Sequence, residues 1–375
     1  NKLLIAGNFF QYKGLYVPGL VRLYDNGNRD ITFLVTQAQF TGDFETFVIQ
    51  PNNKIIACGM FYHSSYYKHR KIVRLHANGV IDTSFKTGNA IWGSGIATSG
   101  FYGGDKIIIG GSFDQYDSVE VISIARIDTL GSIDKTFNLG SGANNEVIDI
   151  AQQPDNKLII AGKFTRYNGA RSMRIARLNS NGTLDPNFTP VILDTWGAIS
   201  SFILLPTGKI LVSGSFTTVN GLNISGLIRL HSNGSLDTSF DYSNLNGYVS
   251  GMGLQSSGKI IITGEFAVGG FGGTSYLARL LPNGDEDLSF NGAFSPNYKF
   301  NEVSVQADDK IILYGWFTIV NGSAQKYIVR LTEDGIVDTT FKIGIGATDI
   351  VKDVAIQKNG KIIIGGNFTA FDGHA

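Results

Sequence analysis

The chain has 375 residues, and 31 Lys and Arg residues balance 31 Asp and Glu residues, so its formal net charge is zero. This balance argues against a nucleic-acid surface or a polybasic membrane contact, because both need clustered positive charge. A single cysteine excludes an internal disulfide and a multi-cysteine metal site, and no apolar run approaches the roughly 18 residues that span a bilayer. The 47 Gly and 8 Pro residues favour short strands joined by glycine turns.

One repeated unit of about 51 residues accounts for the whole chain. The fourth copy begins with an apolar segment at residues 147–151 and a polar corner at 153–156. A second segment, 157–164, has three consecutive Leu or β-branched residues without alternation, which predicts a strand covered on both faces. A variable loop leads to a third segment at 174–178. An Asn-Gly turn and a short fourth segment ending at Phe188 complete the copy.

The end of this copy, residues 177–188, is a twelve-residue phrase with a recurring frame of Arg, Gly, Asp and Phe. The other copies of the phrase lie at 22–33, 74–85, 126–137, 229–240, 279–290 and 330–341. Four short strands in each unit predict an all-β fold, a β-propeller of four-stranded antiparallel blades, with seven or eight blades. An open superhelical β-repeat array is the alternative. Helical repeats are excluded because no segment has helical apolar spacing.

The phrase also predicts which of its residues lie opposite each other in the hairpin. In the sixth copy, residues 282–284 (Pro-Asn-Gly) match a type I turn followed by a left-handed glycine. A three-residue loop of this kind places Arg279 opposite Asp287 on one face of the hairpin. The seven expected cross-strand pairs are Arg22–Asp30, Arg74–Asp82, Arg126–Asp134, Arg177–Asp185, Arg229–Asp237, Arg279–Asp287 and Arg330–Asp338.

We interpret residues 1–375 as a single repeat domain that is an excerpt of a longer chain, with neighbouring domains of that same chain as partners. Residues 1–9 match residues 361–368, so there are eight central strands but only seven hairpins. The expected repeats are 1–33, 34–85, 86–137, 138–188, 189–240, 241–290, 291–341 and a partial copy at 342–375.

The sequence offers little for catalysis or metal binding. Its five histidines have no metal-ligand spacing, and the repeated Asn-Gly-x-x-Asp lacks the alternating oxygen ligands of calcium loops. The Gly-x-Gly segments at 140–142 and 344–346 precede no helix and are interpreted as linkers. We therefore expect no cofactor, no metal and no catalytic residue. A catalytic pair of carboxylates from different blades, as in propeller glycosidases, remains an open alternative.

Copies two and three depart most from the repeat, and aromatic residues gather there. Exposed aromatic side chains on loops of a rigid scaffold suit a glycan or protein ligand. The alternative interpretation is that they fill gaps between blades. The candidate ligand-binding residues are Tyr62, Tyr66, Tyr67, Trp92 and Tyr102.

The frame Gln-x-x-Gly-Lys-Ile-x-x-Gly-Gly-x-Phe, followed by Ile-Ala-Arg-Leu-x-x-Asn-Gly-x-x-Asp-x-x-Phe, resembles the delta-60 repeat family over the whole chain. Residues 153–188 match it almost throughout, whereas copies two and three lack the Asn-Gly of the variable loop. The resemblance implies a propeller-like bacterial repeat, common in large secreted or surface proteins and also found in phage-related ones, without known enzymatic activity.

We therefore expect a non-catalytic binding or structural module of a bacterial secreted or cell-surface protein. It would act in adhesion or protein docking, with a protein or glycan ligand and no nucleic acid or membrane insertion. The alternatives are a structural component of a phage tail or virion, and a propeller hydrolase acting on glycans.

Overall fold

The computed structural model of the chain forms two compact units, 1–190 and 191–375, which are considered separately. The division falls close to the predicted end of the fourth repeat. Every regular element of the described residues is a β-strand, and none of these residues forms a helix long and apolar enough to cross a membrane. The structure describes residues 2–35, 40–63, 71–87, 91–102, 106–138, 140–194, 197–241, 245–268, 275–290 and 295–374.

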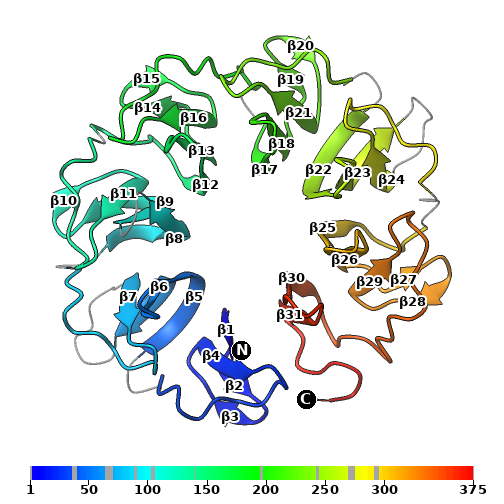
Figure 1. Cartoon of the computed structure of the whole chain (residues 1–375), viewed down its shortest axis with the longest axis horizontal. Helices are drawn as coiled ribbons and strands as arrows, with labels where there is room; N and C mark the ends of the chain where they lie inside the picture. Colours follow the sequence, from blue (N-terminus) through cyan, green and yellow to red (C-terminus); the bar gives the residue numbers. More distant parts are fainter. Residues whose placement is uncertain are drawn as a thin grey trace. The chain divides into compact units, whose positions relative to one another are not determined.

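Each unit is a succession of small antiparallel sheets (Figure 1). The strands of the first unit are β1 (Lys2–Ala6), β2 (Gln11–Tyr12), β3 (Leu15–Tyr16), β4 (Leu20–Tyr24), β5 (Phe40–Ile49), β6 (Ile55–His63), β7 (Ile72–Leu75), β8 (Ile91–Tyr102), β9 (Lys106–Tyr116), β10 (Val119–Glu120), β11 (Ile124–Ile127), β12 (Val147–Gln152), β13 (Leu158–Gly162), β14 (Arg166–Tyr167), β15 (Ala170–Arg171) and β16 (Ile175–Leu178). Those of the second are β17 (Ile199–Leu204), β18 (Ile210–Gly214), β19 (Thr218–Val219), β20 (Leu222–Asn223), β21 (Leu227–Leu230), β22 (Leu245–Leu254), β23 (Ile260–Val268), β24 (Ser275–Leu280), β25 (Phe300–Val305), β26 (Ile311–Gly315), β27 (Ile319–Val320), β28 (Ser323–Ala324), β29 (Ile328–Leu331), β30 (Val351–Ile356) and β31 (Ile362–Gly366).

The sheet of the fourth repeat shows the common plan, with strand order β12-β13-β16. The central strand β13 is buried on both faces, because Leu158, Ile159 and Ile160 are at most 1% exposed. This confirms the strand predicted from the run without alternation. The buried side chains form a core cluster that extends through the second, third and fourth repeats and includes the single cysteine, Cys58. Neighbouring sheets thus cover each other's faces, as repeat architectures require.

The fourth segment of each repeat is shorter than predicted. In the fourth repeat it pairs with β16 through a single bridge between Leu178 and Leu184. The chain then turns, because the Phe188 amide donates to the Asp185 carbonyl at 3.1 Å. The expected fourth strand is therefore one bridge long, and the turn that positions the aspartate ends it.

The phrase hairpin has the predicted three-residue loop. In the sixth repeat the Gly284 amide donates to the Leu281 carbonyl at 2.9 Å, and Leu280 lies opposite Glu286. Asp287 therefore faces Arg279, and the Arg279 Nε lies 2.8 Å from the Asp287 Oδ2. The same contact occurs in all seven copies of the phrase, at 2.6–3.0 Å.

The variable loop contains a small outer hairpin that the sequence did not predict. In the fourth repeat it consists of β14 and β15, joined by Asn168 and Gly169, with φ values of 50° and 74°. Two positive φ values are typical of a type I′ turn, which Asn-Gly favours. Equivalent hairpins are β2–β3, β19–β20 and β27–β28.

Candidate functional site

The recurring aspartate is the centre of a cluster of cations in every repeat. In the second repeat the Asp82 Oδ2 lies 2.8 Å from both the Arg74 Nε and the Lys54 Nζ. The Asp82 Oδ1 accepts hydrogen bonds from the Ser84 amide at 3.1 Å and from the Ser84 hydroxyl at 2.6 Å. The lysines in the other repeats are Lys2, Lys106, Lys157, Lys209, Lys259 and Lys310.

These contacts determine the ionisation of the aspartate. Burial acts to raise the pKa of Asp82, but hydrogen bonds from Lys54 and Ser84 and the charge of Arg74 hold that pKa well below its usual range. Both carboxylate oxygens already accept strong donors. The carboxylate is therefore neither a proton donor near neutral pH nor an open ligand for a metal ion.

The arginine also connects consecutive repeats. The Arg126 Nη1 donates to the Ser180 carbonyl of the next repeat at 2.7 Å, and its guanidinium lies 4.5 Å from the centre of the Phe137 ring. The Asn138 amide donates to the Asn181 carbonyl at 2.6 Å. A Cβ on Gly182 would approach the Phe137 ring to 3.0 Å, so this turn needs glycine for packing as well as for its φ of 84°. The phrase thus connects one repeat to the next, and we call this set of contacts the inter-repeat joint.

The lysine and the inter-repeat contacts were missed at the sequence level. The lysine lies 28 residues before its aspartate in all seven ion pairs, for example Lys157 and Asp185. This constant spacing was a visible signal, but the separation is too long for pairing within one hairpin to suggest the contact.

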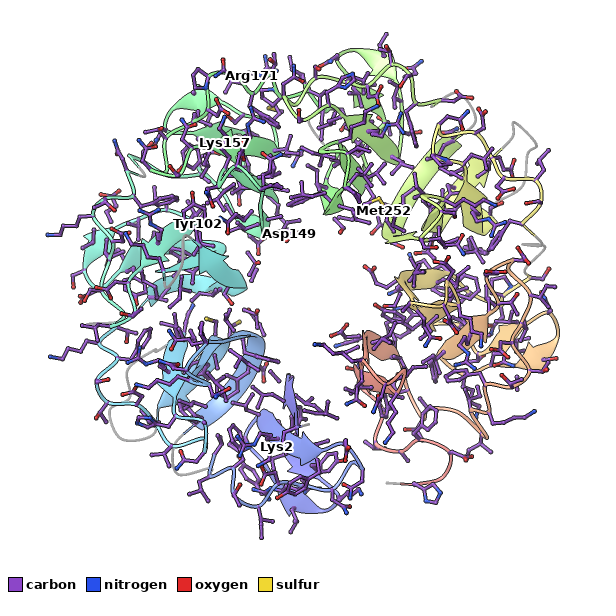
Figure 2. All side chains as sticks on the ribbon, viewed as in Figure 1. Lys2, Tyr102, Asp149, Lys157, Arg171 and Met252 are labelled. Atoms are coloured by element: carbon purple, nitrogen blue, oxygen red, sulfur yellow. The ribbon has the colours of Figure 1, made fainter. Side chains whose placement is uncertain are left out.

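Of the predicted ligand-binding residues, Tyr102 is the one whose side chain the structure describes. It is 3% exposed, and its ring centre lies 6.5 Å from that of Phe137 and 5.4 Å from the Arg126 guanidinium (Figure 2). Its hydroxyl donates to the Asn156 carbonyl of the following repeat. Tyr102 therefore fills a gap between repeats, which is the role given by the alternative interpretation.

The other four predicted residues are described only in part or not at all. Tyr66 and Tyr67 lie outside the described residues. The backbones of Tyr62 and Trp92 belong to β6 and β8, but their side chains also lie outside the described set. Trp92 and Tyr102 lie near opposite ends of β8, roughly 30 Å apart for a strand of this length. The structure does not bring these two residues together, and ligand binding at the others stays a prediction.

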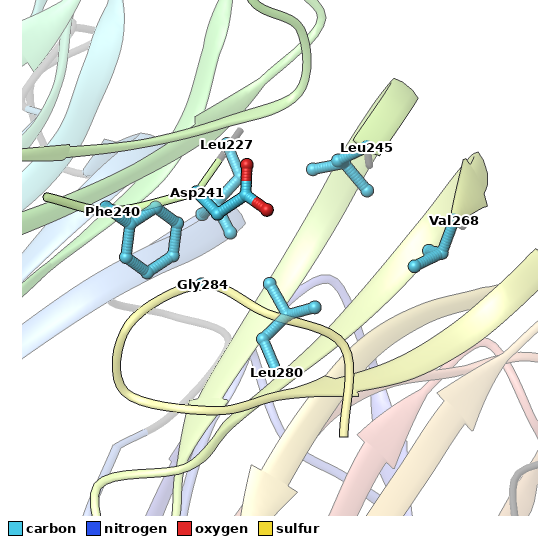
Figure 3. Close-up of a pocket in the computed structure, with 7 residues that line it drawn as sticks. All are labelled: Leu227, Phe240, Asp241, Leu245, Val268, Leu280 and Gly284. Carbon is cyan, nitrogen blue, oxygen red and sulfur yellow. The ribbon is translucent and has the colours of Figure 1, made fainter. Parts of the chain in front are cut away.

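A narrow pocket in the second unit is too small for a ligand (Figure 3). Its volume is about 10 Å³, which is close to the space of a single water molecule. It is lined by Leu227, Phe240, Asp241, Leu245, Val268, Leu280 and Gly284.

A larger pocket lies between the third and fourth repeats of the first unit, and we call it the inter-repeat pocket. Its volume is about 240 Å³. Residues of β8 and β9 form one side, and the segment before β12 forms the other. The lining residues are Gly93, Ser94, Ser112, Phe113, Asp114, Ile122, Ser123, Asn144, Asn145 and Glu146.

The wall supplied by the fourth repeat is held in place by hydrogen bonds. The Asn144 Oδ1 accepts from the amides of Thr165 and Arg166 at 2.8 and 2.9 Å. Glu146 forms an ion pair with Lys163 at 2.7 Å. In contrast, the Asp114 carboxylate is exposed and accepts no hydrogen bond from the described residues. The pocket thus combines a rigid wall with an available carboxylate.

The two carboxylates that line this pocket, Asp114 and Glu146, influence charged groups of the second repeat. Lys71 is 8% exposed, and burial lowers its pKa, against the opposing charges of Glu45 and Asp114. Burial raises the pKa of Glu45, as do the charges of Asp43 and Glu146, while Lys71 lowers it. The charged groups of three consecutive repeats therefore influence one another here.

A second set of carboxyl groups lies on the first strands of the repeats. Burial raises the pKa of Asp149 on β12 (Figure 2). Within the second unit, burial and the charge of Asp353 raise the pKa of Glu302 to about 7. Asp149, Glu302 and Asp353 each follow the irregularity in register of their first strand, so they occupy one repeat position. Among the described residues, no three His, Cys, Asp or Glu residues gather to hold a metal ion.

Comparison with protein families gives a match along the chain. The model described as "Domain of unknown function (DUF5122) beta-propeller" matches residues 1–33, 50–85, 105–137, 153–188, 205–240, 255–290 and 306–341. These seven segments follow the repeats read from the sequence, and they support a propeller repeat family rather than the delta-60 name specifically. No curated protein matches the chain.

Several solved structures resemble it at low identity. The extracellular domain of the two-component system BT3049 from B. thetaiotaomicron is 14% identical with a TM-score of 0.43, covering 93% of this chain and 46% of that one. PorZ, a surface component of the type-IX secretion system of Porphyromonas gingivalis, is 12% identical with a TM-score of 0.44, covering 94% and 49%. The gluconolactonase XC5397 from Xanthomonas campestris is 11% identical with a TM-score of 0.37, covering 70% and 79%. The chain spans about half the length of the BT3049 and PorZ structures.

Proposed function

Because the chain belongs to the DUF5122 β-propeller family, we propose that it is a non-catalytic binding module of a larger bacterial secreted or cell-surface protein. Its role is adhesion or protein docking. The extracellular location is supported by the resemblance of the repeats to a family common in large secreted and surface proteins.

The observation that carries this proposal is the inter-repeat pocket. It combines the hydroxyls of Ser94 and Ser112, the amide of Asn145 and the carboxylate of Asp114 around about 240 Å³. A few polar groups that converge on a concave surface are typical of a ligand site. Hydroxyl and carboxylate groups of this kind suit a hydroxyl-rich ligand, so a glycan is the ligand class that we favour.

The recurring aspartates, in contrast, are unsuitable for ligand binding. Asp82 and its equivalents are buried and neutralised by lysine and arginine from their own repeat. The charged residues that recur in every repeat therefore stabilise the fold. We infer that ligand binding uses positions at which individual repeats differ.

A glycan array with the labelled chain tests the proposal, together with the variants Asp114→Ala and Asp155→Ala. Both aspartates are exposed, but Asp155 lies at a polar corner outside the pocket. We expect Asp114→Ala to weaken binding at least tenfold, which corresponds to about 1.4 kcal/mol, and Asp155→Ala to leave it unchanged. Equal binding by wild type and Asp114→Ala would exclude the pocket. Binding to peptides but to no glycan would favour protein docking.

A glycan hydrolase is the second candidate, and Glu302 is the observation that favours it. A carboxyl group with a pKa near 7 beside a second carboxyl group has the properties of a general acid. A screen of chromogenic glycosides tests this possibility. If turnover disappears in Glu302→Gln and persists in Asp114→Ala, the chain is an enzyme rather than a non-catalytic binding module.

A further inference from the structure

The inter-repeat pocket contains a buried hydroxyl group that the fold leaves without a partner. The Ser123 side chain is only 3% exposed, lines the pocket and forms no hydrogen bond with any described residue. Its backbone is fixed, because the Ser123 amide donates to the Phe113 carbonyl at 2.7 Å and the Ser123 carbonyl accepts from the Gly111 amide at 3.0 Å. A buried hydroxyl group normally has a hydrogen-bond partner. The partner of Ser123 therefore has to come from whatever occupies the pocket.

Two more serine hydroxyls, those of Ser94 and Ser112, line the same pocket. Within the described part of the chain, neither forms a hydrogen bond. Ser112 and Asp114 flank the buried Phe113 on β9, so strand alternation directs both side chains to the face opposite Phe113. A hydroxyl group can donate and accept, whereas a carboxylate only accepts. The pocket thus presents three available hydroxyls beside an available carboxylate.

The charges of the lining residues favour a cationic ligand. Asp114 and Glu146 line the pocket, and no Lys, Arg or His is among the described lining residues. Glu146 is already paired with Lys163 at 2.7 Å. Asp114 raises the pKa of Lys71, but among the described residues it forms no ion pair. One carboxylate at the pocket is therefore left uncompensated.

A ligand that covers this carboxylate displaces its water. A neutral ligand offsets little of that cost, whereas a cation with hydrogen-bond donors offsets much more of it. A protonated primary amine has three N–H donors and no acceptor, which matches a carboxylate surrounded by hydroxyl groups. The pocket volume of about 240 Å³ lies below the roughly 300–1,000 Å³ of drug-sized sites, so it suits a single sugar ring.

On the basis of the glycan binding proposed above, we propose that the inter-repeat pocket recognises an amino sugar. Its protonated amine lies on the Asp114 carboxylate, and its ring hydroxyls bond to the three serines. An N-acetylated sugar of the same shape lacks the positive charge, and a uronic acid carries the opposite charge. Both therefore bind more weakly than the free amine, and one carboxylate determines the selectivity.

Isothermal titration calorimetry of the full chain compares the trisaccharide of glucosamine with that of N-acetylglucosamine. The two probes have the same linkage and the same ring, but acetylation removes the positive charges. We expect the glucosamine trisaccharide to bind at least tenfold more tightly, about the factor that one charge-assisted hydrogen bond supplies. The difference should shrink at high salt. Equal dissociation constants in the wild-type chain would overturn amine recognition and leave glycan binding itself standing.

Three variants assign the selectivity to residues. Asp114→Asn removes the charge at nearly constant size and should lower the affinity for the glucosamine trisaccharide to that for the acetylated probe. Asp155→Asn, the matched control outside the pocket, should retain the tenfold difference. Ser123→Ala should weaken both probes without lowering the free energy of unfolding, because this hydroxyl bonds to no described residue. A tenfold preference that persists in Asp114→Asn would refute the proposal.

Further outcomes separate amine recognition from the proposed function. If N-acetyllysinamide binds as tightly as the glucosamine trisaccharide, the pocket recognises a lysine side chain of a partner protein and the amino sugar is excluded. If neither trisaccharide binds but other glycans on the array do, amine recognition alone is refuted. If no glycan binds at all, both the amino sugar and the glycan-binding function are refuted.

Discussion

The charge of Asp185 should contribute far more to stability than that of Asp155, although both lie near one lysine. The Lys157 Nζ is 2.8 Å from the Asp185 Oδ2 and 3.9 Å from the Asp155 Oδ2. The Asp185 side chain is 1% exposed and the Asp155 side chain is 54% exposed. The two substitutions Asp185→Asn and Asp155→Asn remove one charge each and retain an oxygen acceptor.

The structure gives the expected magnitudes. Asp185→Asn leaves Arg177, whose side chain is 8% exposed, without its carboxylate partner. Removal of one member of a buried ion pair typically costs about 3–5 kcal/mol, whereas an exposed pair contributes about 0–1 kcal/mol. For a unit of this size, the larger cost lowers the melting temperature by roughly 6–20 °C.

Urea unfolding followed by circular dichroism measures both variants at low and high salt. We expect the Asp185→Asn effect to persist at high salt, because a buried pair is weakly screened, and the small Asp155→Asn effect to diminish. A cost for Asp185→Asn no larger than that for Asp155→Asn would refute the assignment of the phrase aspartates as structural.

Two further predictions concern packing and pH. Gly182→Ala should destabilise the chain by about 1–3 kcal/mol more than Gly169→Ala in urea unfolding, because both residues have positive φ but a Cβ on Gly182 meets the Phe137 ring. Equal costs would contradict that packing argument. Glu302 has a pKa raised to about 7, so between pH 4.5 and 7 the folded chain binds more protons than the unfolded chain, and stability falls as pH rises. Glu302→Gln should therefore match wild type near pH 4 and exceed it by roughly 2–3 kcal/mol at pH 8. Parallel pH profiles of unfolding free energy for the two proteins would contradict this.

The parts of the fold that depend on local spacing were predictable from the sequence. The register of Arg279 and Asp287 followed from a three-residue turn, and the burial of Ile159 and Ile160 followed from a run without alternation. Both properties are decided within one hairpin or one strand. The length of the fourth strand was overestimated, because the sequence pattern did not show that the Asp185 turn follows a single bridge.

The candidate sites depend on contacts between segments far apart in the sequence, and they were not predictable. The aromatic composition around Tyr102 suggested exposure, but Phe137 and Asn156, from other segments, bury that residue. The inter-repeat pocket is lined by residues of two repeats, among them Asp114 and Asn144. A single sequence contains no signal for which loops meet there.

The inter-repeat joint has a consequence for how such chains can evolve. Asp134 takes both its cations, Arg126 and Lys106, from its own repeat, and Arg126 requires from the next repeat only a backbone carbonyl, that of Ser180. A backbone acceptor is available whatever side chain the neighbour carries. After duplication, deletion or exchange of one whole repeat, each such arginine therefore still finds a backbone carbonyl in the repeat that follows it. Recombination can then change the length of the array and replace a ligand-bearing repeat without redesigning its neighbours.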